Sequence, residues 1–186
     1  MKNNIRNYVF CALCIALCVV LPMAFHAIPN AGQVILPMHI PVLICGLICG
    51  WHFGLLCGLA GPLLSSLLTG MPPVALLPSM MVELAVYGVI TALMMKLVNT
   101  KRLYADLYIS LVTAMIIGRI AAGIVKGFIL SRGGFTFDMW LTTHFLTALP
   151  GIAIQLALIP SLYVALQRAG IIPRKYEGKK AEEANG

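Results

Sequence analysis

Charged residues are scarce in this chain. They make up 10% of the 186 residues, whereas 60% are hydrophobic, and soluble domains carry about 25% charged residues. This composition excludes a water-soluble domain of any size and requires a lipid environment. At about 20 residues per spanning helix, the chain supplies at most six or seven membrane helices with short connections. We therefore predict an all-α integral membrane protein.

Recognisable catalytic motifs are also missing. No P-loop pattern for nucleotide binding occurs, and Ser65, Ser66, His39 and His144 show none of the spacings typical of a nucleophile or a metal site. We therefore expect no catalytic residue, no metal and no cofactor, although an intramembrane enzyme stays an alternative. The six cysteines all lie in apolar stretches, where we expect them to act as small buried hydrophobic residues.

Clusters of Gly, Pro and charged residues divide the chain into six apolar stretches. These stretches cover residues 8–25, 40–50, 53–69, 77–97, 107–130 and 139–167. The region between residues 40 and 70 is too short for two full perpendicular spans. Either the second helix is short or the chain has five spans. We predict a bundle of six transmembrane helices with a short second helix.

The positions of the basic residues favour six spans. Ten of the thirteen Lys and Arg precede the first stretch, separate the fourth from the fifth, or follow the last. Six spans put all ten on one side, which is then the cytoplasmic side because cytoplasmic loops are rich in Lys and Arg. We predict cytoplasmic N- and C-termini, a single membrane domain over residues 1–170 and a flexible cytoplasmic tail over residues 171–186. These residues form no compact basic patch, so no nucleic-acid partner is expected.

The first apolar stretch has two further features. It resembles a secretory signal peptide, but it is long for one and lacks a clear cleavage site. It also carries Ala12-x-x-x-Ala16, and small residues at this spacing let membrane helices approach closely. This pattern fits packing within the bundle and docking of a partner equally well. A second series with the same spacing, Gly46, Gly50, Gly54 and Gly58, predicts close packing of the second and third helices.

Two segments on the predicted outer side are rich in proline. Residues 26–40 and 69–78 contain Pro29, Pro37, Pro72 and other Pro, Gly and amide residues. Proline fixes the backbone and removes an amide donor, so irregular but stiff loops are expected. Irregular backbone at membrane depth is buried in protein or lines a wet cavity. We therefore predict structured outer loops over a cavity that opens to the outside.

Polar residues at one depth mark that cavity. With a rise of about 1.5 Å per residue, Glu83, Lys126 and His144 lie about 8 to 10 Å from the outer ends of three helices. Tyr87 lies one turn below Glu83 on the same face. Charges inside a membrane domain are costly and usually functional. The alternatives are that Glu83 and Lys126 form an ion pair that only locks the bundle, and that His144 is a satisfied polar residue near the interface.

Arg119 lies seven residues before Lys126 and therefore two turns deeper on the same face. At that depth it is level with Gln155. A guanidinium pairs well with the oxygens of a carboxylate or phosphate, so Arg119 is a candidate for an anionic ligand. The alternative is a structural clamp in which Arg119 bonds Gln155 or backbone carbonyls.

Taken together, these features resemble the substrate-binding S component of an energy-coupling factor (ECF) vitamin transporter. The resemblance rests on the small size, Ala12-x-x-x-Ala16, the outer segment Pro37-Met38-His39-Ile40-Pro41, the glycine-rich second and third helices and the basic connection after the fourth. It covers residues 7–168. Each motif is common by itself, and their combination carries the resemblance.

The resemblance implies a binder of a water-soluble vitamin or related micronutrient in the cell membrane of a prokaryote. Its partners would be a transmembrane coupling subunit, on which Ala12 and Ala16 dock, and two cytoplasmic ATPases, which energise toppling of the whole S component in the lipid bilayer. The Pro-rich outer segments would act as lids. The substrate-binding candidates are Asn30, Gln33, His39, Glu83, Tyr87, Arg119, Lys126, Trp140, His144 and Gln155.

The sequence indicates the identity of the substrate less clearly than it indicates the transporter family. Of the two tryptophans, only Trp140 lies at the outer end, so an aromatic-rich pocket of the kind expected for thiamin is not indicated. Arg119 and Lys126 favour a carboxylate-bearing vitamin such as pantothenate, and Glu83 would neutralise Lys126 or receive a hydroxyl or amine of the ligand. The alternative function is a stand-alone ion-coupled transporter with Glu83 as its proton site, although no internal duplication is visible.

Overall fold

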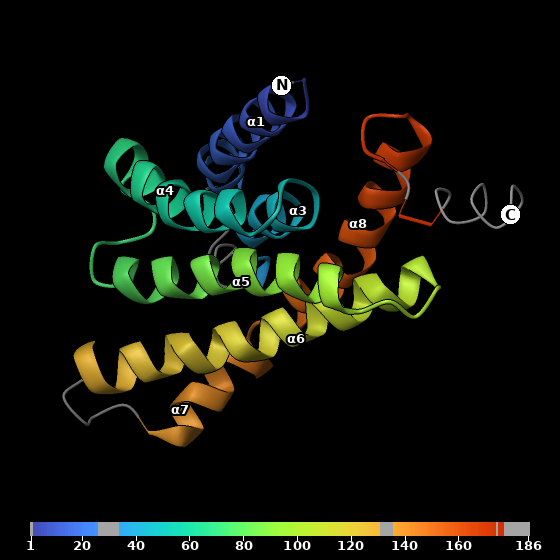
Figure 1. Ribbon diagram of the computed structural model, residues 1–186. Coiled ribbons are helices and arrows are strands. Elements are labelled where there is room, and N and C mark those ends of the chain that lie inside the picture. The colour runs from blue at the N-terminus through green and yellow to red at the C-terminus, as the bar shows by residue number, and fades with distance from the viewer. Residues whose placement is uncertain (1, 26–33, 131–135, 174, 177–186) are drawn as a thin grey trace, which may run out of the picture.

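The computed structural model describes residues 2–25, 34–130, 136–173 and 175–176, and this part of the chain is helical without strands. The elements are α1 (Lys2–Ala24), α3 (His39–Cys49), α4 (Trp51–Thr69), α5 (Leu77–Leu97), α6 (Leu103–Ile124), α7 (Phe137–Leu141) and α8 (Leu149–Arg168), with π-helical turns η1 (Val125–Leu130) and η2 (Thr142–Leu146) (Figure 1). The predicted all-α class is confirmed.

In the part of the chain that the structure describes, five helices are long and apolar enough to cross a membrane. They cover Ile5–Ala24, Trp51–Thr69, Leu77–Leu97, Leu103–Gly127 and Leu149–Arg168. The remaining apolar helix, α3, has 11 residues and is therefore about 16 Å long, roughly half the thickness of the hydrocarbon core. The predicted short second helix is thus present, and the chain is a multi-pass membrane protein. Six spans remain a prediction.

Glycines bring α3, α4 and α5 into close contact. A Cβ atom on Gly54 would lie 2.5 Å from the carbonyl oxygen of Gly88, and one on Gly58 would lie 2.5 Å from that of Leu84. Gly46 also faces Gly88. These backbones approach as closely as small residues allow in membrane helices. Three of the four glycines thus have a packing role, but they pack on α5 and not between the second and third helices as predicted. Gly50 instead has a φ of 93° and forms the turn between α3 and α4.

One face of α1 is buried and another is exposed. Cys11, Cys14 and Cys18 pack into a cluster with residues of α3, α4 and α5, and all six cysteines are buried free thiols, as predicted. Ala12 and Ala16 lie on the exposed face. The structure therefore decides against packing within the bundle for this pair.

Three segments meet at one end of the bundle. The Arg6 guanidinium donates to the carbonyl of Ile171 at 3.3 Å, and Lys175 Nζ donates to the carbonyl of Val98 at 2.8 Å. The start of α1, the α5–α6 turn and the residues after α8 therefore lie together, as the predicted topology requires. Lys175 and Tyr176, which were expected in a flexible tail, are held there by Asp106 of α6.

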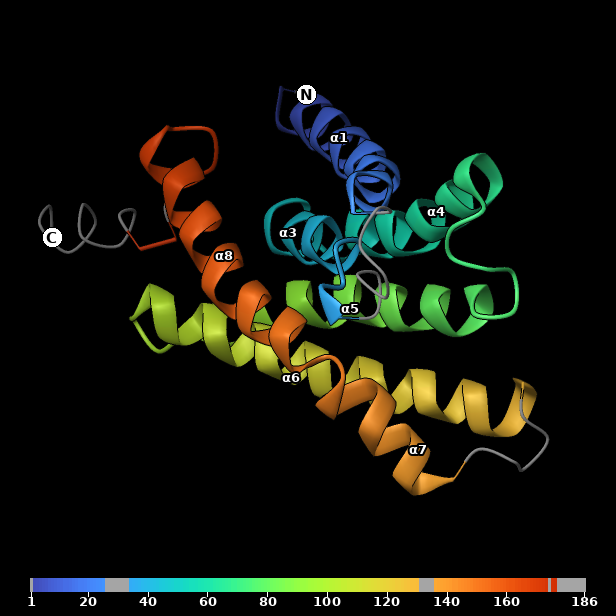
Figure 2. The same ribbon diagram turned by 180° about the vertical axis from the view of Figure 1, so that it is seen from behind.

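The last predicted helix, over residues 139–167, is broken. It consists of α7, the π-turn η2 and α8, and Figure 2 shows α7 separated from α8 by an irregular turn and lying along the later part of α6. Pro150 lies in the first turn of α8. Proline has no amide hydrogen and clashes with a preceding helical turn, so it begins a helix more readily than it continues one. The break turns α7 and η2 toward α6.

Candidate functional site

A buried polar chain links α5 to α6 near the end of α6. Tyr87 donates its hydroxyl hydrogen to Glu83 Oε1, one turn earlier on α5, at 3.2 Å. Arg119 Nε of α6 donates to the same Tyr87 oxygen at 3.1 Å. Arg119 is 1% exposed and Tyr87 is fully buried. Because Arg can only donate and an ionised carboxylate can only accept, the hydrogen bonds run in one direction, from Arg119 through Tyr87 to Glu83.

A glycine on α6 admits the tyrosine ring. Gly118 precedes Arg119, and a Cβ atom at this position would overlap the Tyr87 ring. Its absence lets the ring lie against the α6 backbone. The phenol oxygen thereby comes within hydrogen-bond distance of the Arg119 side chain. Gly118 therefore positions Tyr87, and this role was not predicted from the sequence.

His39, at the start of α3, adds an imidazole to the cluster. It is 2% exposed, its Nε2 lies 3.7 Å from Glu83 Oε1, and its ring packs edge-on against Tyr87 at 5.3 Å between centroids. Neither ring nitrogen has a hydrogen-bond partner within the described residues. The short second helix thus brings a polar residue into the predicted layer.

The segment formed by α7 and η2 covers Arg119. Trp140 Nε1 donates to the backbone carbonyl of Arg119 at 3.1 Å, and the indole occupies a notch at Gly123, where a Cβ atom would overlap it. The Phe145 ring centroid lies 5.5 Å from the Arg119 Cζ atom, which is within the range of a cation–π contact. His144, also buried, stacks with Trp140 at 6.4 Å.

Gln155 connects α8 to the outer segment. Its amide donates to the carbonyl of Leu36 at 3.5 Å, the same carbonyl that accepts from the His39 backbone amide at 3.1 Å. Gly151 is close to the same segment, since a Cβ atom there would lie 2.5 Å from the Val34 carbonyl oxygen. Gln155 and His39 are therefore neighbours across Leu36, and the described part of the first outer segment packs on α8.

The structure changes two of the pairings considered from the sequence. Glu83 lies beside His39, and Lys126, which is half-buried in η1, does not come within 4 Å of the Glu83 carboxylate. Arg119 is bonded to Tyr87 and not to Gln155. The estimate of depth from straight helices did not foresee that Tyr87 of α5 reaches across to Arg119.

Eight of the ten substrate-binding candidates lie in the described part of the chain. Seven of them, from His39 to Gln155, gather around Arg119 or Leu36, and Lys126 lies at the periphery. Asn30 and Gln33 lie outside the described residues. The residues that the sequence did not single out are Phe145, Gly118 and Gly123. Both glycines are close to Arg119 in the sequence, but nothing in their spacing revealed which rings they admit.

The cluster contains polar atoms that the fold leaves without hydrogen bonds. Among the described residues, no hydrogen-bond partner is found for either ring nitrogen of His39, for Arg119 Nη2 or for Gln155 Oε1. A buried polar atom without a partner costs about 1–3 kcal/mol. Such atoms are rare in folded proteins, so several in one cluster call for partners beyond the described residues.

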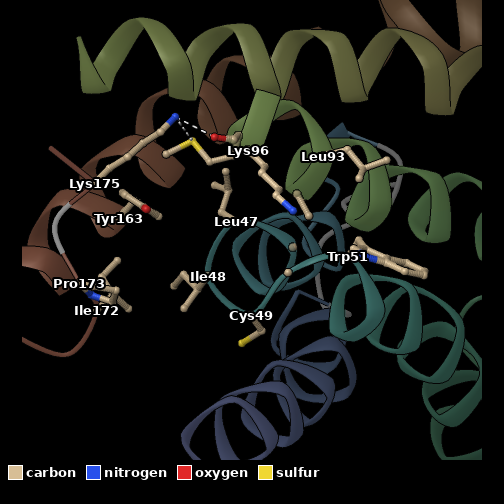
Figure 3. Close-up of a pocket in the computed structure, with 14 residues that line it drawn as sticks. Leu47, Ile48, Cys49, Trp51, Leu93, Lys96, Tyr163, Ile172, Pro173 and Lys175 are labelled. Carbon is tan, nitrogen blue, oxygen red and sulfur yellow. Dashed lines mark hydrogen bonds between the residues drawn. The ribbon is translucent and has the colours of Figure 1, made fainter. Parts of the chain in front are cut away.

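A cavity of about 420 Å³ lies at the other end of the bundle. It is bounded by the end of α3, the start of α4, the end of α5 and the residues after α8 (Figure 3). Its walls are mainly apolar, with Lys96 and Lys175 as charged residues. Lys175 is already bonded to Asp106 at 2.5 Å and to the carbonyl of Met95 at 2.7 Å. This cavity is therefore separate from the cluster around Arg119.

Asp106 anchors the same end. It is fully buried and accepts from the Thr100 hydroxyl at 2.6 Å, from the Thr100 amide at 3.0 Å, from Lys175 and from Tyr176. Partial burial and the adjacent carboxylate raise the pKa of Tyr176 to about 12. The Tyr176 hydroxyl therefore stays protonated and donates to Asp106.

One family of known proteins matches the chain over most of its length. The model of the family described as "ECF transporter, substrate-specific component" matches residues 6–163. Neither a curated protein nor a solved structure is significantly similar to the chain. The chain belongs to this family, which confirms the resemblance inferred from the sequence. The family is one of transporter components and not of enzymes.

Proposed function

We propose that this substrate-specific component binds a small water-soluble vitamin that carries a carboxylate, with pantothenate as the first candidate. The observation that carries the proposal is the Arg119 guanidinium. It is 1% exposed, and its Nη2 has no acceptor among the described residues. A carboxylate is a fitting partner, because a guanidinium fork bonds two anionic oxygens at once.

The charge of the cluster supports an anionic ligand. Arg119 and Lys126 are cationic, whereas Glu83 is the acid in contact with the group. Arg119 and Glu83 balance each other, so the half-buried Lys126 at the periphery of the cluster supplies one excess positive charge. In the low dielectric of a membrane domain an excess charge is costly, and a monovalent anion removes that cost. A phosphate dianion would reverse the sign of the imbalance.

The proposed partners follow from the family and from α1. Family membership supports assembly with a transmembrane coupling subunit and two ATPases in the membrane of a prokaryotic cell. Ala12 and Ala16 lie on the exposed face of α1, where small side chains permit a second helix to approach closely. We propose this face as the docking surface for the coupling subunit.

Binding in lipid nanodiscs tests the function. A panel of vitamins is titrated against the wild-type chain and Arg119→Gln. Charged hydrogen bonds contribute about 1.5–3 kcal/mol, so we expect one carboxylate vitamin to bind wild type and to lose about 10- to 100-fold in affinity in the variant. Arg119→Lys, which keeps the charge, should lose less, and Arg168→Gln, exposed at the opposite end, should bind like wild type.

Two results would contradict the proposal. A folded wild-type chain that binds no vitamin of the panel would remove the substrate-binding role assigned to the cluster. Equal affinity of wild type and Arg119→Gln for the bound vitamin would remove the assigned role of Arg119. Folding is followed in each variant by size-exclusion profile and thermal unfolding.

Docking is tested by copurification. Ala12→Trp with Ala16→Trp should abolish copurification with the coupling subunit and leave substrate affinity unchanged. The matched control is Ile116→Trp with Ile120→Trp, which has the same four-residue spacing on the exposed face of α6. The control should copurify normally. If it fails as the alanine variant does, bulk on any exposed face disturbs assembly and the assignment to α1 is wrong.

A further inference from the structure

The unsatisfied polar atoms of the cluster differ in kind from one side of Tyr87 to the other. On the Arg119 side, the unpartnered atom is Nη2, which is a hydrogen-bond donor. On the Glu83 side, the open positions are mainly acceptors. Gln155 Oε1 has no partner within the described residues, and Glu83 accepts from Tyr87 through Oε1 while part of its side-chain surface stays exposed.

Tyr87 keeps the two sides apart. Its hydroxyl receives a hydrogen bond from Arg119 and gives its hydrogen to Glu83, with the Met115 carbonyl as a more distant acceptor at 3.5 Å, so its single donor is used. The Arg119 guanidinium and the Glu83 carboxylate are therefore held two hydrogen bonds apart and form no direct ion pair. An acid and a base that neutralised each other directly would leave little for a ligand to recognise. Here each keeps free hydrogen-bonding capacity.

His39 packs against the side of the cluster where the open acceptors lie. It lies against both Glu83 and Tyr87, and its backbone shares the Leu36 carbonyl with the Gln155 amide. The Glu83 side chain keeps 11% of its surface exposed, against 2% for His39. A neutral imidazole offers one donor and one acceptor, so it can serve either kind of ligand group. The acceptor excess at this end therefore comes from Glu83 and Gln155.

We infer that the substrate is bifunctional, with a carboxylate held by Arg119 and a hydroxyl, amine or amide N–H group held by Glu83 and Gln155. This inference rests on the proposed function and narrows it. A carboxylate alone would satisfy Arg119 and leave the acceptors of the Glu83 side without donors. Pantothenate, with hydroxyl groups and an amide, and biotin, with ureido N–H groups, meet both requirements. Nicotinate and lipoate have a carboxylate but no such donor.

The first test compares these four acids in nanodiscs. We expect pantothenate or biotin to bind at least 100-fold more tightly than nicotinate and lipoate. Tightest binding of nicotinate or lipoate would overturn the inference and leave the proposed carboxylate function standing. Binding of none of the four by a folded chain would overturn both, and so would exclusive binding of a vitamin without a carboxylate.

The second test assigns each end of the substrate to its residue. If pantothenate binds, its alcohol analogue, pantothenol, and its O-methylated analogues are compared in wild type, Arg119→Gln and Glu83→Gln. Arg119→Gln should weaken pantothenate about 10- to 100-fold and pantothenol within about 3-fold. Glu83→Gln should weaken pantothenate about 10-fold and an analogue methylated at the recognised hydroxyl within about 3-fold. For biotin, N-methylation of the ureido group and amidation of the carboxylate supply the same comparisons.

The double comparison separates recognition from a structural role. A residue that only holds the bundle together lowers the affinity for all analogues by the same factor, because it has no particular contact with either end. Uniform losses in both variants would therefore overturn the inference. Glu83→Asp provides a check on folding, since it keeps the carboxylate and should retain the preference for the unmethylated ligand.

Discussion

Two buried acids, Glu83 and Asp106, lie near opposite ends of the α5–α6 pair and have different surroundings. Asp106 accepts four hydrogen bonds, including one from the ammonium of Lys175 at 2.5 Å. Glu83 accepts one from Tyr87 at 3.2 Å, and its nearest cationic candidate is His39 at 3.7 Å. The protein thus supplies Asp106 with four hydrogen bonds and a counter-ion, whereas it supplies Glu83 with one hydrogen bond.

This difference separates a structural site from a binding site. A buried charge is stable when its hydrogen bonds and its counter-ion are supplied by the fold. Asp106 meets that requirement and joins the α5–α6 turn to the residues after α8. Around Glu83, atoms of His39, Arg119 and Gln155 have no hydrogen-bond partner within the described residues, which therefore do not complete the network by themselves. We propose that a ligand of complementary polarity completes it.

The largest expected effect on stability comes from Asp106. Asp106→Asn removes the counter-ion of Lys175 and replaces the oxygen that accepts from Lys175 and Tyr176 by an amide donor, while Oδ1 can still accept from Thr100. We therefore expect a loss of about 3 kcal/mol in the free energy of unfolding. Substrate affinity should stay within about 2-fold, because the site lies at the other end. Thermal unfolding and titration in nanodiscs measure the two quantities. A large loss of affinity in folded protein would show that the two ends are coupled.

A smaller effect on stability, together with a loss of affinity, is expected at Tyr87. Tyr87→Phe keeps the ring in the Gly118 notch but removes the hydroxyl between Arg119 and Glu83. We expect a loss of about 1–2 kcal/mol in stability, since two buried groups lose a partner, and a loss of about 10-fold in affinity, since neither group is then held in place. Saturating substrate should restore part of the lost stability. An affinity equal to that of wild type would show that Tyr87 does not order the site.

The class of fold and the residue types of the site could be predicted from the sequence, because both depend on where charges occur in an apolar chain. Glu83, Arg119 and His144 stand out for that reason alone. The pairings could not be predicted. A depth estimate assumes straight helices, whereas Pro150 breaks the last one and the notches at Gly118 and Gly123 let Tyr87 and Trp140 reach α6.

The basic end shows the same limit. Charge and small residues predicted a flexible tail over residues 171–186, and the structure places Lys175 and Tyr176 on Asp106. Asp106 was not recognised from the sequence, because an acid beside a basic turn is typical of an exposed surface. Its role depends on contacts between residues about 70 positions apart, which no local pattern reveals.

The smallest expected effect is at Lys96, which lines the cavity at the basic end. Lys96→Gln should change substrate affinity by less than about 2-fold, because Lys96 lies on α5 more than three turns beyond Glu83 and is exposed. The substrate affinities of Lys96→Gln and Arg119→Gln are compared in the same titration in nanodiscs. If Lys96→Gln lowers the affinity 10-fold or more while Arg119→Gln binds like wild type, the substrate binds in this cavity. The missing hydrogen bonds around Glu83 would then need an explanation without a ligand.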